Sequence, residues 1–223
     1  MPPSPASNRL RRAAVPAFAF LVTLFARFVT AVRGVWIGNE PSDRQRVYFA
    51  NHASHGDFLL VWIVLSPRLR RRTRPVAGAD YWLKSPLRRF IGCDVFNAVL
   101  IDRNRETRTR DPIEIMREAV DEGSSLILFP EGTRNETKAA LQPFKAGLYH
   151  LAASRPALEL VPVWIENLNR VMPKGEFVPV PLICSVIFGP TIQVAEGEAA
   201  DAFLERARAA LLALKPVRNG SAA

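Results

Sequence analysis

The amino-acid sequence predicts a single α/β domain, with a largely parallel central sheet flanked by helices and an amphipathic helix at the N-terminus. Three observations lead to this fold class. Short apolar runs alternate with helical patterns from residue 47 to residue 214. Several of these runs are apolar almost without interruption, which is typical of strands that are covered on both faces. The chain has 223 residues, which is enough for one such domain with its own core.

The individual elements follow from hydrophobic periodicity and from the residues that begin and end helices. The apolar runs predict strands at Val47–Ala50, Pro75–Ala79, Val95–Ile101, Ser125–Phe129, Leu158–Trp164 and Leu182–Phe188. The helical patterns predict helices at Phe58–Leu65, Tyr81–Phe90, Pro112–Asp121, Phe144–Ala153 and Ala199–Leu214. Prolines make Leu168–Pro181 a rigid, irregular connection. We therefore divide the chain into a basic N-terminal segment (1–38), the α/β domain (39–214) and a flexible tail (215–223).

The N-terminal segment contains a mostly apolar stretch from Pro16 to Gly38. Its polar residues Thr23, Arg27, Thr30 and Arg33 recur every three or four positions, so they form one narrow stripe on a helix. A wide apolar arc beside an arginine stripe is typical of a helix that lies in the headgroup region of a membrane, with its arginines reaching toward phosphates. The alternatives are a membrane-spanning helix, a cleaved secretory signal and a helix packed in the core of the protein.

The composition narrows the choice of partners. The formal net charge of +9 favours a phosphate-rich partner, such as an anionic membrane surface, a phosphorylated small molecule or a nucleic acid. Basic residues gather in residues 1–38 and 68–89, and together with the apolar stretch they favour a membrane surface. A nucleic acid is disfavoured because the chain has no recognisable nucleic-acid-binding motif. Cys93 and Cys184 fit no metal-ligand spacing, so we expect reduced, buried thiols and no zinc site.

The strongest candidate for catalysis is the segment Asn51–Asp57, between a predicted strand and a predicted helix. A histidine and an aspartate across such a turn can pair, so that Asp57 fixes the tautomer of His52 and stabilises its protonated form. An alcohol needs a base of this kind to become a good nucleophile. His55 is a rival base in the same loop, and Ser54 with Asp57 also fits a helix-capping box. A hydrolase with a Gly-x-Ser-x-Gly nucleophile is excluded, because the chain lacks that motif.

Two further predicted strands are followed by arginines. Arg134 closes a Pro-Glu-Gly-Thr-Arg turn after one of them, and Arg103 lies just after another. In a parallel sheet these strand ends share one edge, where ligands bind. An arginine at this edge can hold a phosphate with two hydrogen bonds, and a glycine-containing turn can expose backbone N–H groups. The alternative is that Arg134 pairs with Glu131 or Glu136, and Arg103 with Asp102, which would make both arginines structural.

These segments occur in one order along the chain. A strand leads to Asn-His-x-x-x-x-Asp (51–57), a second to Ile-Asp-Arg (101–103) and a third to Phe-Pro-Glu-Gly-Thr-Arg (129–134), and Val-Pro-Val follows at 161–163. In this order they resemble the four sequence blocks of the glycerolipid acyltransferase family, the PlsC-like 1-acylglycerol-3-phosphate acyltransferases. The resemblance extends over residues 51–163, and its first and third blocks are highly specific.

The resemblance implies an O-acyltransferase that moves a fatty acyl group from acyl-CoA or acyl-carrier protein to the free hydroxyl of a lysophospholipid. It points to 1-acylglycerol-3-phosphate as the acceptor, which would give phosphatidic acid. It implies no metal and no cofactor, because the acyl donor is a co-substrate. It also implies membrane lipids as partners, no nucleic acid, and a location at the cytoplasmic face of the inner or plasma membrane.

The resemblance further assigns roles to residues. It implies that His52 is the general base and that Asp57 is its partner. It implies that two arginines contact the phosphate of the acceptor while the turn before the second one shapes the site. The substrate-binding residues expected in this way are Arg103, Glu131, Gly132, Thr133 and Arg134.

Two features depart from the family. Many members continue the third block with serine, where this chain has Asn135, and the N-terminal anchor looks like one helix rather than two. Neither removes a catalytic residue, but both leave the acceptor open. The remaining candidates are an acyltransferase for another lysophospholipid or a lyso-aminolipid, and a lipid-binding protein on the same fold that does not catalyse.

Overall fold

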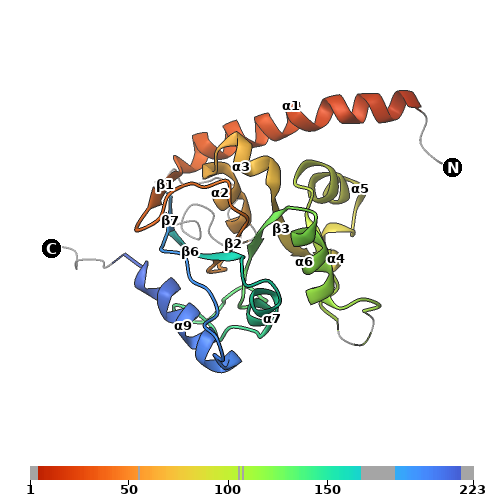
Figure 1. The fold of residues 1–223 in the computed structure, drawn as a ribbon. Coiled ribbons are helices and arrows are strands. Elements are labelled where there is room, and N and C mark those ends of the chain that lie inside the picture. The colour runs from red at the N-terminus through yellow and green to blue at the C-terminus, as the bar shows by residue number, and fades with distance from the viewer. Residues whose placement is uncertain (1–4, 55, 105, 107, 167–183, 217–223) are drawn as a thin grey trace, which may run out of the picture.

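The structure is a computed structural model that describes residues 5–54, 56–104, 106, 108–166 and 184–216. These residues form a seven-stranded sheet with the order β1-β7-β6-β2-β5-β3-β4 (Figure 1). Strands β2 to β6 run parallel to one another, whereas β7 pairs antiparallel with β6 and carries β1 at the edge. The strands are β1 Arg33–Trp36, β2 Arg46–Ala50, β3 Thr73–Gly78, β4 Val99–Ile101, β5 Ser125–Leu128, β6 Glu159–Glu166 and β7 Ser185–Phe188. The predicted single α/β domain with a largely parallel sheet is confirmed.

Helices cover both faces of the sheet (Figure 1). They are α1 Pro5–Thr30, α2 Asp57–Val64, α3 Pro67–Arg72, α4 Ala79–Trp82, α5 Pro86–Arg89, the π-helix η1 Phe90–Val95, α6 Pro112–Asp121, α7 Gly147–Ser154 and α9 Ala200–Ala213. Successive side chains of a strand point to opposite faces. Val47 and Phe49 of β2 therefore join the core beneath α6, α7 and α9, while Tyr48 and Ala50 join the core beneath α1, α2 and α3. One buried strand thus contributes to both halves of the core.

The parallel strands place the sequence motifs together. Phe49 of β2 pairs with Leu128 of β5, and Gly78 of β3 pairs with Ile101 of β4. Because β2, β5, β3 and β4 are parallel, their C-terminal ends lie along one edge of the sheet. The loops that leave this edge carry residues 51–57, 129–134 and 102–103, and a site that uses all three segments belongs there.

The predicted helix Tyr81–Phe90 is wrong, because the structure divides this stretch into α4, α5 and the beginning of η1. The break comes at Pro86, whose ring lacks an N–H group and clashes with the preceding turn of a continuing helix. Ser85 begins the new helix, since its hydroxyl accepts the backbone N–H of Arg88.

Other boundaries differ from the prediction for local reasons. The predicted strand Val95–Ile101 begins only at Val99, because the chain is still helical at Val95 and Asn97 takes a left-handed conformation with φ +48°. Helix α3 was not predicted, although Ser66 caps it and Pro67 opens it. The remaining predicted elements lie where expected, with ends shifted by a few residues.

The N-terminal helix stops short of its predicted end at Gly38. Ala31 adopts a left-handed conformation with φ +41°, which ends α1. Residues Arg33–Trp36 then form β1 on the edge of the sheet, where the ring of Trp36 stacks on Phe188 at 4.0 Å. These four residues of the predicted N-terminal segment therefore belong to the sheet, and their aromatic and β-branched side chains suit a strand.

The two threonines in the polar stripe of α1 face the protein. Thr23 and Thr30 are buried, and each hydroxyl donates to the carbonyl four residues earlier at 2.7 Å. Arg27 donates to the carbonyl of Ile63, one of the last carbonyls of α2, which have no partner within that helix. Arg27 is nevertheless exposed, so its predicted reach toward lipid phosphates stays a prediction. The outward face of α1 exposes large apolar side chains: Phe20, Leu21, Leu24, Phe25 and Phe28.

Within the described residues, none of the helices has both the length and the hydropathy that crossing a membrane would require. Three earlier expectations lie outside the described residues, namely His55 as a rival base, the irregular connection Leu168–Pro181, and the tail from residue 217 onward.

Candidate active site

The loop after β2 holds a histidine against a buried carboxylate. Nδ1 of His52 lies 2.8 Å from Oδ2 of Asp57, the first residue of α2. The same oxygen accepts the backbone N–H groups of Ala53 at 2.7 Å and Ser54 at 2.8 Å. Three donors on one oxygen fix the carboxylate, and through it the plane of the imidazole. Because Nδ1 donates to Asp57, Nε2 is the ring nitrogen left to accept a proton.

The capping alternative for this loop is realised in part. Asp57 accepts the N–H of Ser54, which is one half of a capping box. The other half is missing, since the Ser54 hydroxyl accepts from Gly56 at 3.3 Å and the N-cap of α2 has no side-chain hydrogen bond. The same carboxylate oxygen therefore both shapes the start of the helix and orients His52.

The segment after β5 makes three contacts with His52. Oε1 of Glu131 accepts the backbone N–H of His52 at 2.9 Å, and the carbonyl of His52 accepts the N–H of Asn135 at 2.7 Å. The ring of Phe129 stacks on the imidazole at 4.2 Å. Glu131 is 2% exposed, its second oxygen accepts the N–H of Gln142, and burial raises the pKa of its carboxyl. Glu131 therefore supports the histidine loop from behind.

Asn51 ties the same loop to β6. Its amide donates to the carbonyl of Ile165 at 3.1 Å, and its carbonyl oxygen accepts the N–H of Ile165 at 2.7 Å. The side chain thus continues the hydrogen bonding between β2 and β6 where the backbone of β2 turns away. The sequence prediction gave Asn51 no role, although an asparagine directly before the histidine was visible.

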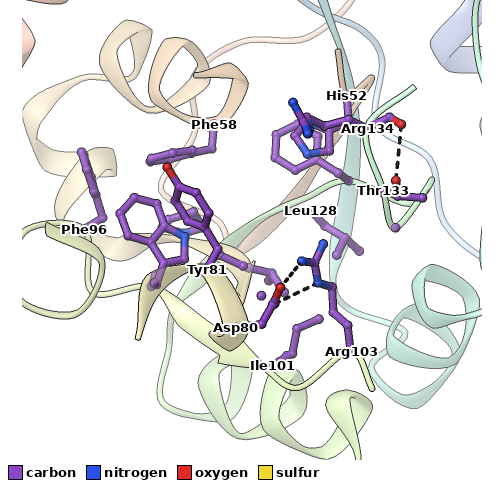
Figure 2. Close-up of a pocket in the computed structure, with 18 of the residues that line it drawn as sticks. His52, Phe58, Asp80, Tyr81, Phe96, Ile101, Arg103, Leu128, Thr133 and Arg134 are labelled. Atoms are coloured by element: carbon purple, nitrogen blue, oxygen red, sulfur yellow. Dashed lines mark hydrogen bonds and ion pairs between the residues drawn. The ribbon is translucent and has the colours of Figure 1, made fainter. Parts of the chain in front are cut away.

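A pocket of about 370 Å³ opens at this edge of the sheet (Figure 2). It brings together five of the seven predicted site residues, which are His52, Arg103, Gly132, Thr133 and Arg134. The other two, Asp57 and Glu131, are buried behind its wall. For Glu131 this placement differs from the expected direct contact with a substrate.

The wall opposite His52 and Arg134 is aromatic (Figure 2). Phe58 packs edge-on against Trp82 at 5.9 Å and against Phe96 at 5.0 Å, and Tyr81 stands beside them. Sequence reasoning missed this wall, because these residues come from three separate parts of the chain, α2, α4 and the end of η1, and their aromatic type alone does not separate pocket from core. A pocket that is cationic on one side and aromatic on the other suits an amphiphilic ligand.

The two arginines differ in how they are held. Arg103 forms a fork with Asp80, through Nη2 at 2.7 Å and Nε at 3.2 Å, a partner that the sequence did not suggest. Arg134 lies 3.8 Å from the carboxylate of Glu136, which is too long for a hydrogen bond. Neither contact removes the arginine from the pocket wall.

The structure explains the residue type at Gly132 and shows what the side chain of Asn135, just after the third segment, contacts. Gly132 has φ +74°, a conformation that favours glycine, and a Cβ there would lie 2.7 Å from the side-chain carbons of Lys145, which would have to move. Asn135 turns its side chain into its own loop, where it accepts from Thr137 and donates to the carbonyl of Ala139. Asn135, which departs from the usual serine, thus bonds within its own loop and is not among the residues that line the pocket.

Comparison with known proteins places the chain in a family. The sequence matches the Acyltransferase family over residues 35–166, which is more than half of the chain. A 1-acyl-sn-glycerol-3-phosphate acyltransferase from Cocos nucifera is 32% identical over 151 residues, covering 61% of this chain and 44% of that protein. Proteins of the same name from Limnanthes douglasii and Haemophilus influenzae are 30% and 26% identical, covering 70% and 58% of this chain and 53% and 55% of their own lengths. The chain spans about half the length of these relatives.

A solved structure shares the fold. The crystal structure of the 1-acyl-sn-glycerophosphate (LPA) acyltransferase PlsC from Thermotoga maritima matches with a TM-score of 0.67 and 20% identity, over 91% of this chain and 79% of that one. The four sequence blocks fall inside the matched range 35–166, and the sheet gathers the first three around one pocket. On this evidence, the chain belongs to the PlsC-like acyltransferase family.

Proposed function

We propose that this protein is an O-acyltransferase that moves a fatty acyl group from acyl-CoA or acyl-carrier protein to the free hydroxyl of a lysophospholipid. The proposed acceptor is 1-acylglycerol-3-phosphate, and the product is phosphatidic acid. One observation carries the proposal: His52, paired with buried Asp57, lines the same pocket as Arg103 and Arg134. A base for a hydroxyl and cations for a phosphate are what this acceptor requires.

In the proposed mechanism, Nε2 of His52 takes the proton of the acceptor hydroxyl while the oxygen attacks the thioester carbonyl. Asp57 keeps the proton on Nδ1 and stabilises the imidazolium that forms. The tetrahedral intermediate then collapses with cleavage of the C–S bond, and the imidazolium returns its proton to the leaving thiolate. The acyl group passes directly from sulfur to oxygen, so no acyl-enzyme is required.

The pocket suggests how the acceptor lies. Its phosphate would be held by Arg103 and Arg134, which come from loops after β4 and β5. A charge-assisted contact of this kind contributes about 1.5–3 kcal/mol. The aromatic wall formed with Phe58 and Phe96 offers apolar surface for a fatty acyl chain.

We further propose that the protein binds the cytoplasmic face of a membrane, with α1 lying in the membrane plane. The apolar outward face of α1 supports this, since exposed apolar patches commonly mark such contacts. Leu83 and Leu87 near α5 are also exposed, at 51% and 63%, and they alternate with the basic residues Lys84 and Arg88 on the rim of the pocket. Basic side chains there would attract anionic headgroups.

The acceptor is tested with purified full-length protein, acyl-CoA, and either 1-acylglycerol-3-phosphate or its dephosphorylated monoacylglycerol. We expect a strong preference for the phosphate and a loss of at least about 100-fold in kcat for His52→Ala. Arg134→Ala should raise the KM for the phosphorylated acceptor by roughly 10- to 100-fold, with little change in the KM for the donor. Arg134→Lys should restore only part of this, because a point charge cannot replace the guanidinium fork.

The matched control is Arg155→Ala, which removes an arginine that pairs with Asp121 away from the pocket. It should leave both KM values unchanged. If the wild-type protein does not distinguish the two acceptors, the acceptor is not a lysophosphatidate. Replacing acyl-CoA by acyl-carrier protein in the same assay identifies the donor.

A further inference from the structure

Asp80 and Arg103 form a two-point ion pair on the wall of the pocket (Figure 2). Nε of Arg103 lies 3.2 Å from Oδ1 of Asp80, and Nη2 lies 2.7 Å from Oδ2. The hydrogen bond from Arg103 lowers the pKa of the Asp80 carboxyl below its ordinary value, so the pair is fully charged at neutral pH. The hydrogen bonds of this pair do not include His52 or Asp57. We therefore ask what the pair does for Arg103.

The sheet builds this pair through its register. Gly78 of β3 pairs with Ile101 of β4, and Asp80 and Arg103 each lie two residues beyond those partners. A Cβ on Gly78 would overlap Oδ1 of Asp80 and lie 2.6 Å from Nε of Arg103. The ion pair therefore rests directly on the backbone of Gly78, and glycine leaves it the necessary room.

Stability does not explain the arrangement well. The side chains of Arg103 and Asp80 are 49% and 60% exposed. Ion pairs at such exposure contribute little to folding, because water screens them and holding two long side chains costs entropy. A fork with fixed geometry does, however, set the plane and direction of a guanidinium group.

The pair with Asp80 uses only one edge of the Arg103 guanidinium, the edge formed by Nε and Nη2. A guanidinium has five N–H groups, and Asp80 takes the one on Nε and one on Nη2. The two N–H groups of Nη1 and the second one of Nη2 lie outside the pair with Asp80, and one N–H from each of these two nitrogens forms another fork that matches a phosphate.

We propose that Asp80 is a positioning residue, which holds the guanidinium of Arg103 so that its free fork meets the phosphate of the acceptor. The proposal rests on the function proposed above, since it gives Arg103 a phosphate to bind. Asp80 itself touches no reacting atom. Its effect is on acceptor binding, and the proton transfer at His52 does not depend on it.

The experiment measures both KM values and kcat for Asp80→Asn in the full-length protein, with 1-acylglycerol-3-phosphate and acyl-CoA. Arg103 keeps its charge in this variant but loses its orientation, so the acceptor KM should rise about three- to tenfold. The donor KM and kcat should change little, a split that a general loss of structure would not produce. In the background of Arg103→Gln, adding Asp80→Asn should have no further effect, because the two changes act through one contact.

Two variants sharpen the test. Gly78→Ala places a methyl group against Asp80 and Arg103, so it should also raise the KM for the acceptor. Glu122→Gln removes an equal charge from another carboxylate that pairs with an arginine, Arg74, outside the pocket, so it should match the wild type. A rise in acceptor KM for Glu122→Gln equal to that for Asp80→Asn would show a general charge effect and overturn the proposal.

The outcomes separate this inference from the proposed function. If the wild-type protein does not prefer a phosphorylated acceptor, the proposed function fails first. If it does, and Arg103→Gln raises the acceptor KM while Asp80→Asn and Gly78→Ala do not, only the positioning role is overturned. A lower acceptor KM in Asp80→Asn would also overturn it, because Asp80 would then compete with the phosphate for Arg103.

Discussion

Replacing Asp57 by asparagine separates the charge of this residue from its shape. The side chain is 2% exposed, and its Oδ2 accepts hydrogen bonds from His52, Ala53 and Ser54. In Asp57→Asn, the amide oxygen can take the place of Oδ2 and keep all three donors. The imidazolium then loses its negative partner. In the other orientation, the amide donates to Nδ1 and forces the proton onto Nε2, which blocks the base. Both orientations slow acyl transfer.

The size of this effect follows from the role of the base. Proton abstraction by a positioned side chain contributes about 10²–10⁴ in rate, and a histidine of the wrong tautomer or without charge support loses much of that factor. A loss of 10²–10⁴ in kcat corresponds to about 2.7–5.4 kcal/mol of transition-state stabilisation. Acceptor KM should change little, because Asp57 is not on the pocket wall.

The assay is acyl transfer at saturating donor and acceptor, with a thermal melt to establish that the variant is folded. The double variant His52→Ala/Asp57→Asn should be no slower than His52→Ala alone, since the two residues act as a unit. Ser54→Ala is the matched control, because Ser54 contributes only its backbone N–H to Asp57, and it should stay close to wild type. An Asp57→Asn variant within about tenfold of wild-type kcat would refute the pairing argument.

Three further predictions concern the rest of the molecule. Phe28→Ser on the exposed face of α1 should shift protein from vesicle pellets to the supernatant in a sedimentation assay. The control Leu212→Ser, which changes an exposed apolar residue of α9, should not. Equal behaviour of the two variants would place the membrane contact elsewhere. The hydrogen bond from Arg206 lowers the pKa of Glu198 to about 2, so the difference in Tm between wild type and Glu198→Gln should be present above pH 4.5 and vanish as the pH falls toward 2; a difference that persists at pH 2 contradicts this linkage. Burial raises the pKa of Cys184 to about 11, and mass spectrometry should find it unlabelled by a thiol reagent at pH 8 unless the protein is unfolded.

The parts of the site that depend on neighbouring residues could be predicted from the sequence. His52 and Asp57 are five residues apart, so a strand followed by a helix is enough to bring them together. The supports of that pair come from distant parts of the chain. Glu131 reaches the backbone of His52 across 79 residues, and Asp80 meets Arg103 across 23 residues through the register of β3 and β4. A single sequence carries no signal for that register, because both strands are short and only three residue pairs join them.

The N-terminal helix shows a different limit. Periodicity identified the polar stripe correctly, since Thr23, Arg27 and Thr30 do share one face of α1. It could not tell which side of the helix faces the protein, because the apolar arc is wide enough to satisfy either arrangement. The choice is made by contacts with distant residues, such as the hydrogen bond from Arg27 to the carbonyl of Ile63, which have no sequence signature.

The pairing of β1 with β7 fixes the order in which the molecule can be completed during synthesis. Arg33 pairs with Ser185, so the edge of the sheet must wait for more than a hundred further residues to leave the ribosome. At 5–20 residues per second this separation takes roughly 8 to 30 s. During that interval α1 has already left the ribosome, its large apolar side chains are exposed, and the sheet beside it is not complete. If the protein binds a membrane as proposed, capture of α1 during translation would cover these side chains before the fold can close, and it would protect the nascent chain from aggregation.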